Sequence, residues 1–174
     1  DSNLWGTDNT AFRIVTSGFF KTEQDLDAVI AYARKVIPQF PVERLKNVIQ
    51  VTPNMQAFGE FTGNAIRLWE GAEQGTLYHE IFEAVVNKLL KNYEWNAILK
   101  EFNNRKGNFI ERETGNTISY SKATPQQAKE EIAEEFRTFK MTGKLFSGAK
   151  NTRTFFQVII DFIKSLFNNQ VTIN

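Results

Sequence analysis

One histidine and two nearby glutamates are the residues whose types and spacing best suit chemistry in this chain. His79, Glu80 and Glu83 lie in the segment GTLYHEIFE. On a helix, residues four apart share one face and are separated by about 40°. An imidazole and a carboxylate placed in this way can hold a divalent metal, and an adjacent glutamate can act as a general base. The more ordinary interpretation is a hydrogen-bonded histidine beside two surface glutamates.

The helix that must position these residues is expected from about Thr76 to Lys91. Its apolar face is formed by Tyr78, Phe82, Val85, Val86, Leu89 and Leu90. On the helical wheel, His79 and Glu83 fall at the edge of this face. Because a buried polar group costs free energy unless it is paired, both side chains need partners in the protein or a metal.

A second acidic pair, Glu130 and Glu134, lies further along the chain. It belongs to a helix expected to begin at Pro125, with Thr124 as its N-cap, and to end near Met141. Taken alone, this pair is typical of a solvated acidic face, since the helix macrodipole favours negative charge near the N-terminus.

The remaining pattern predicts strands before the motif helix and helices after it. Strands are expected at Ala11–Val15, Leu45–Val51, Gln56–Phe61 and Ala65–Trp69, the last two forming a hairpin around the turn Thr62-Gly63-Asn64. Further helices are expected at Thr22–Val36, Tyr93–Phe102 and Arg153–Asn168, the last of them buried, with a loop and a small hairpin around Gly115-Asn116 within Arg105–Lys122. This order is typical of an α+β domain.

The amino-acid composition excludes several classes of function. The 174 residues suit one domain, and 41% hydrophobic with 24% charged residues is typical of a globular protein. Since the chain has no cysteine, disulfides and cysteine nucleophiles are excluded, and its single histidine excludes mechanisms that need two. A net charge of +1 gives no reason to expect nucleic-acid or membrane binding. The longest apolar stretch, Phe155 to Phe167, is too short to span a bilayer.

The segments GTLYHEIFEAVVNKLL and EEIAEEFRTF together resemble the zincin metallopeptidases, above all zincin-like domains in large proteins of bacteriophages and mobile elements. In those domains a segment GTxxHExxHxV precedes a helix ExxAExF, and the resemblance covers roughly Lys46 to Met141. It implies an α+β zincin-like fold, in which a small mixed β-sheet with a hairpin packs on the motif helix and a mostly helical C-terminal half follows. It also implies a single domain over 1–174, with a core at about 11–141 and a packing helix in 142–174, as a fragment of a longer protein.

The same resemblance implies roles for the candidate residues. His79 matches a metal ligand, and Glu80 matches the base that activates metal-bound water. Glu83 stands where the family has its second histidine, and either Glu130 or Glu134 would be the third ligand. A glutamate at position 83 adds negative charge and weakens the Lewis acidity of the metal relative to a His₂Glu site. We therefore expect a divalent metal, zinc in the family, to bind weakly here or not at all.

Two functions follow from the resemblance. The favoured one is a degenerate metallopeptidase that serves as a structural or interaction module of a phage or mobile-element protein and contacts its other domains. The alternative is an active metal-dependent peptidase, a hydrolase with Glu80 as base and a peptide or protein as substrate. The implied location is the virion or the bacterial host cytoplasm, with neither nucleic acid nor membrane as partner. Residues 46–51, 56–61 and 65–69 are expected to share a sheet, with the helix of His79 packed on it. A helical conformation of this region would defeat the family assignment.

Overall fold

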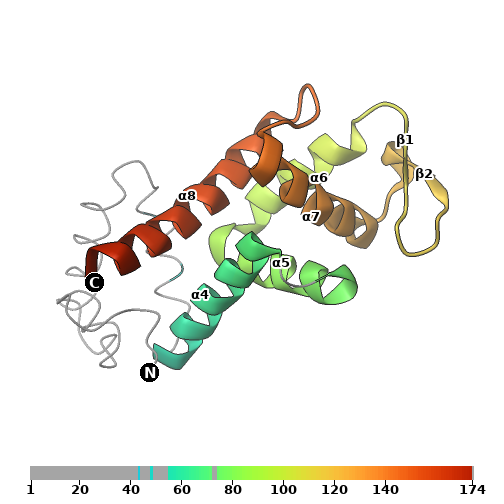
Figure 1. Ribbon diagram of the computed structural model, residues 1–174. Coiled ribbons are helices and arrows are strands. Elements are labelled where there is room, and N and C mark those ends of the chain that lie inside the picture. The colour runs from blue at the N-terminus through green and yellow to red at the C-terminus, as the bar shows by residue number, and fades with distance from the viewer. Residues whose placement is uncertain (1–42, 44–47, 49–54, 72–73, 174) are drawn as a thin grey trace.

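The computed structural model describes residues 43, 48, 55–71 and 74–173 of the chain (Figure 1). In chain order its elements are α4 (Met55–Glu70), α5 (Gly75–Leu89), α6 (Asn92–Asn103), β1 (Asn108–Ile110), β2 (Thr117–Ser119), the 3-10 turn η1 (Tyr120–Lys122), α7 (Pro125–Thr142) and α8 (Lys150–Ile173). The described part is therefore mostly helical with a small antiparallel sheet. The mixture of helices and strands that we predicted from the sequence is therefore confirmed.

The upstream hairpin predicted at Gln56–Phe61 and Ala65–Trp69 is wrong, because these residues form helix α4. The buried side chains of α4 include Phe61, Ala65 and Leu68, and they recur at helical spacing on the face that packs against α5 and α8. Burying that face outweighs the turn preference of Gly63, whose cost inside a helix is about 1 kcal/mol. The small mixed sheet expected on the motif helix is therefore not formed by these residues.

Val48 falls in the predicted strand Leu45–Val51, and it is also helical and fully buried in the core. The strand prediction is therefore wrong at this residue. The predicted strand Ala11–Val15 and the predicted helix Thr22–Val36 lie outside the described residues.

The sheet that does form is the small hairpin predicted around Gly115-Asn116. In it β1 pairs antiparallel with β2, and Phe109 lies opposite Ile118. Gly115 has a φ of +77°, a left-handed conformation that L side chains rarely adopt, and this conformation closes the turn. The ring of Phe109 lies 5.5 Å from that of Phe102, measured between centroids, and this contact attaches the hairpin to α6.

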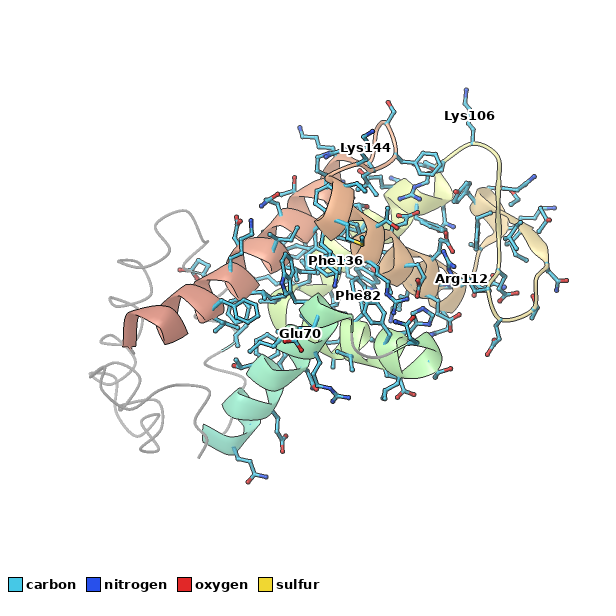
Figure 2. All side chains as sticks on the ribbon, in the orientation of Figure 1. Glu70, Phe82, Lys106, Arg112, Phe136 and Lys144 are labelled. Carbon is cyan, nitrogen blue, oxygen red and sulfur yellow. The ribbon has the colours of Figure 1, made fainter. Side chains whose placement is uncertain are left out.

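An aromatic ladder holds the helices of the core together. Phe82 of α5, Phe136 of α7 and Phe156 of α8 follow one another with ring centroids 6.1 and 5.3 Å apart. Figure 2 shows Phe82 and Phe136 in the middle of the helical assembly. Each such pair contributes about 0.5–1.5 kcal/mol beyond the burial of its area. Helix α8 also packs against α4 and α6, which confirms the prediction that the final helix is buried.

Helices α6 and α7 begin and end within about one residue of the prediction, whereas α8, at Lys150–Ile173, is longer at both ends than the expected Arg153–Asn168. Thr124 caps α7 by accepting a hydrogen bond from the Gln127 backbone, and Pro125 is its first residue. Helix α8 begins at Lys150, earlier than the expected Arg153, because the side chain of Glu101 on α6 satisfies its first backbone N–H groups. Within the described residues, no helix combines the length and the apolar content that crossing a bilayer requires.

Candidate functional site

His79 faces helix α7 and makes a hydrogen bond across the α5–α7 interface. Its Nε2 lies 2.8 Å from Oε2 of Glu134, and the two side chains are only 15% and 10% exposed. His79 lies at the edge of the apolar face, where a polar side chain needs a partner, and the carboxylate of Glu134 is that partner. The structure thus brings together two of the predicted site residues, His79 and Glu134.

The second oxygen of Glu134 is also occupied. Oε1 accepts a hydrogen bond of 3.0 Å from Arg137, one turn further along α7, and lies 4.0 Å from Nε of Arg112. The hydrogen bond from His79, aided by the charges of Arg137 and Arg112, lowers the pKa of Glu134 below its ordinary value, although burial opposes this effect. Glu134 is therefore a carboxylate at neutral pH, and its negative charge is balanced by protein cations.

Arg137 links this carboxylate to the beginning of the motif helix. Its Nη1 also donates to Oε1 of Gln74, the residue that precedes α5, at 3.0 Å. Its guanidinium lies 3.7 Å from the centre of the Tyr78 ring, which is close enough for a cation–π contact. Burial raises the pKa of Tyr78 to about 12, so this phenol remains neutral at physiological pH.

Glu83 lies one helical turn beyond His79 and has a different partner. Its Oε2 is 3.1 Å from Nζ of Lys129 on α7, and both side chains are partly exposed. The pairings of His79 with Glu134 and of Glu83 with Lys129 run in opposite directions along the two helices. Helices α5 and α7 are therefore antiparallel where they meet, and two polar contacts connect them.

The other two predicted site residues lie apart from this cluster. Glu80, the expected base, is exposed, and its carboxylate makes no hydrogen bond or ion pair with another described residue. Glu130 accepts a hydrogen bond from Gln126 on its own helix at 3.0 Å. Of the two glutamates between which the prediction could not choose, Glu134 is the one that reaches His79.

The donor set does not fit the divalent metal that the resemblance implies. Among the described residues, no three histidine, aspartate or glutamate side chains converge on one point. His79 and Glu134 meet, but Glu134 is already paired with Arg137, and Glu83 is paired with Lys129. A divalent ion placed between these carboxylates would be repelled by both protein cations.

The sequence did not predict a further charged cluster, in which Glu135 of α7 pairs with Arg105. Arg105 donates two hydrogen bonds to Glu135, at 2.5 and 2.9 Å, and its side chain is only 6% exposed. Its guanidinium lies 4.7 Å from the ring centre of Phe102 and 4.6 Å from that of Phe146. No local spacing connects Arg105 with Glu135, whereas the i,i+3 spacing of Glu134 and Arg137 was visible in the sequence.

We compared the chain with protein-family models, curated proteins and solved structures, and none of the three comparisons found a match. The resemblance to zincins is therefore carried by the two helical motifs alone.

Proposed function

We propose that this chain is a non-catalytic structural and interaction module, in which protein cations take the place that a metal has in a zincin. One observation carries the proposal. The carboxylate of Glu134, which is hydrogen-bonded to His79, is paired with Arg137, and that of Glu83, one turn beyond His79, is paired with Lys129, so cations of helix α7 neutralise both. The contacts of His79 with Glu134 and of Glu83 with Lys129 connect α5 to α7 without a ligand.

The proposal keeps the degenerate metallopeptidase that we favoured from the sequence, but gives it a narrower basis. Residues 55–70 form helix α4 in place of the upstream hairpin, which is the outcome that would defeat the family assignment. The proposed module therefore depends on the contacts between α5 and α7 and not on a zincin fold. What remains is a motif helix and an acidic helix that meet through His79 and Glu134. As a module, the chain would contribute a folded helical unit to a longer phage or mobile-element protein.

Thermal unfolding with and without zinc tests the proposal. A ligand present at 100 times its Kd stabilises the folded state by about 2.7 kcal/mol. For a chain of this size, that raises Tm by about 5–10 °C. We expect 100 µM zinc chloride to leave Tm of the full chain unchanged. A rise of that size would mean that His79 and Glu134 do bind the metal and would contradict the proposal.

The variant Glu83→His provides the matched positive control, because it restores the second histidine of the motif. Improving the ligand shell of a site typically changes metal affinity by about 10–100-fold. We expect this variant to gain zinc affinity relative to the wild type, most strongly when Lys129→Met removes the competing cation. If neither change increases zinc binding, His79 and Glu134 are not placed as ligands at all.

The peptidase is the second candidate, because the contact between His79 and Glu134 brings two ligand-type side chains together. It places two ligand-type atoms 2.8 Å apart, one residue from the exposed Glu80. This function would also require a third ligand. Zinc-dependent cleavage of a generic peptide library by the wild type, lost in Glu80→Gln, would establish it in place of the module.

A further inference from the structure

The end of helix α4 is held by a side chain from α7, which is distant in the chain. Nζ of Lys140 donates hydrogen bonds to the backbone carbonyl oxygens of Leu68, at 3.1 Å, and of Trp69. The last carbonyl groups of a helix have no partner within the helix and carry partial negative charge, so a cation placed beside them is favourable. Lys140 therefore supplies a C-terminal cap for α4 across a tertiary contact.

The surroundings of the Lys140 amine differ from those of an ordinary surface lysine. Its Nζ lies 5.6 Å from the ring centre of Trp69, within reach of a cation–π contact. Burial lowers the pKa of Lys140 below its ordinary value, and the nearby charge of Arg137 adds to this effect, whereas Glu70 opposes it. The carbonyl acceptors and the ring must offset the cost of bringing this amine out of water and close to a second cation.

Arg137, one turn before Lys140 on α7, holds the other side of the connection between α4 and α5. Its Nη1 donates to Oε1 of Gln74, the residue that precedes α5. Nε2 of Gln74 donates in turn to the carbonyl oxygen of Gly71 at 3.1 Å. The two ends of this connection are therefore joined to each other, and successive turns of α7 hold both of them.

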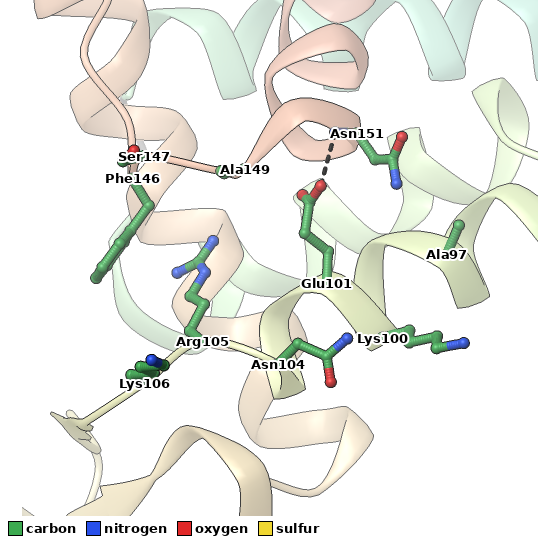
Figure 3. Close-up of a pocket in the computed structure, with 11 residues that line it drawn as sticks. Ala97, Lys100, Glu101, Asn104, Arg105, Lys106, Phe146, Ser147, Ala149 and Asn151 are labelled. Carbon is green, nitrogen blue, oxygen red and sulfur yellow. Dashed lines mark hydrogen bonds between the residues drawn. The ribbon is translucent and has the colours of Figure 1, made fainter.

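Helix α8 has the same kind of cap at its beginning, with the opposite charge. The carboxylate of Glu101 on α6 accepts hydrogen bonds from the backbone N–H of Asn151, at 2.8 Å, and of Thr152, at 3.0 Å (Figure 3). A negative group at the beginning of a helix and a positive group at its end are the arrangement that the macrodipole favours. In both cases another helix supplies the cap, so the closure of one helix end depends on how the two helices pack.

We propose that α7 clamps the connection between α4 and α5, and that Lys140 is the residue that keeps the end of α4 closed. When the amine of Lys140 is removed, residues 64–71 open while α5 to α8 remain packed. Local opening of this kind begins at helix ends whose hydrogen bonds and buried contacts are few. The clamp goes beyond the contacts between α5 and α7 on which the proposed function depends, because it acts on α4.

Hydrogen exchange of the full chain, followed by NMR at single amides, tests the clamp. Lys140→Met keeps an unbranched side chain but removes the donor and the charge. We expect the amides of residues 65–71 to exchange about tenfold faster than in the wild type, and those of α6 and α8 to stay within about twofold. Lys144→Met is the matched control, because it removes the same charge from an exposed position after α7. It should leave all these rates within about twofold of the wild type.

Gln74→Ala tests the second contact of the clamp, and it provides the result if Lys140→Met does not fold. It removes the acceptor of Arg137 and the donor to Gly71 from an exposed position, so the amides of residues 65–71 should exchange about threefold faster. Unchanged rates in both clamp variants would overturn the proposal. So would equal acceleration throughout α6 and α8, which means a general loss of stability, or equal acceleration in Lys144→Met.

Discussion

Helix α7 carries two charged networks, and they differ in how completely the protein encloses them. Towards α5, Glu134 meets His79 and Arg137, and the nearby Arg112 is 61% exposed. Towards α6, Glu135 holds Arg105 by two hydrogen bonds, and aromatic rings surround the guanidinium. The first network contains the residues that drew attention in the sequence, whereas the second had no visible motif.

From this difference we expect that a motif-like spacing is not a measure of structural importance. A bidentate, buried arginine–carboxylate pair leaves a charge without compensation if either partner is removed, and that penalty is large. The network of His79 shares its charge among several groups and borders on solvent at Arg112. We therefore expect the cluster without a motif to be the more sensitive to substitution.

The largest effect should come from Arg105→Ala. This change leaves Glu135, which is only 14% exposed, without its partner and removes the contacts with Phe102 and Phe146. Breaking a buried pair in this way typically costs about 3–5 kcal/mol. Urea unfolding of the full chain measures this loss. A loss below about 1 kcal/mol is typical of an ordinary surface salt bridge. It would contradict the expectation that the Arg105 pair is more sensitive to substitution than the His79 network.

A smaller loss is expected for His79→Ala. This variant removes one hydrogen-bond partner of Glu134 but leaves Arg137 in place, so the carboxylate keeps a cation. We expect a loss of about 1–3 kcal/mol in the free energy of unfolding, measured by the same urea titration. His79→Gln keeps a hydrogen-bond donor, and it should recover part of the loss. A larger effect than that of Arg105→Ala would show that the motif helix depends on His79 more than the geometry indicates.

The pH dependence of two neighbouring glutamates should have opposite signs. The pKa of Glu134 is lowered, mainly by the hydrogen bond with His79, so its stabilisation is present above its unfolded pKa and lost as pH falls through the folded pKa. The pKa of Glu131 is raised by burial, so its ionisation destabilises the fold as pH rises through the folded pKa.

Glu134→Gln and Glu131→Gln measure these two contributions. At pH 7, Glu134→Gln should be less stable than the wild type, and Glu131→Gln should be more stable by less than about 1 kcal/mol. As the pH falls, the difference for Glu131→Gln should disappear first, because the folded pKa of Glu131 is raised, and the difference for Glu134→Gln should persist to lower pH, because the folded pKa of Glu134 is lowered. Urea midpoints recorded as the pH is lowered are the measurement. Shifts of the same sign for both variants at pH 7 would contradict these assignments.

The smallest effect is expected for Glu80→Gln. The sequence predicts two outcomes for this variant. In a degenerate module, removing one charge from a cleft crowded with carboxylates would stabilise the fold by about 0.5–1 kcal/mol, whereas in an active peptidase the stability would be nearly unchanged. The structure instead leaves Glu80 exposed and pairs its acidic neighbours with cations. We now expect a change within about 0.5 kcal/mol by urea unfolding, which is typical of a surface position. A clear stabilisation would instead support repulsion between Glu80 and neighbouring carboxylates, as predicted from the sequence.

Local signals in the sequence were sufficient for the elements after the motif. Thr124 and Pro125 mark the beginning of α7, and its apolar residues recur with the period of a helix. Gly115 supplies the left-handed turn of the small hairpin. These features depend on backbone preferences and on spacing within one segment, so they can be recognised without knowledge of the neighbouring elements.

The conformation of residues 56–69 depended on contacts that no local pattern reveals. The turn-like residues around Gly63 suggested a hairpin, but a continuous helix allows Phe61, Ala65 and Leu68 to be buried against α5 and α8. Burial of an apolar face outweighs a propensity difference of about 1 kcal/mol, and it does so only once the partner surfaces exist.

By itself, the sequence determined that His79 and Glu83 lie at the edge of a buried helix face and therefore need partners. Only the tertiary structure decided which partners they have. For His79, Glu134 was one of two candidate partners, and no pattern in the sequence pointed to Lys129 as the partner of Glu83, because both partners lie on a helix that is distant in the chain. The pairing of Arg105 with Glu135 had no signal in the sequence for the same reason. Side-chain partners across an interface depend on how two helices pack, and spacing within either helix does not contain that information.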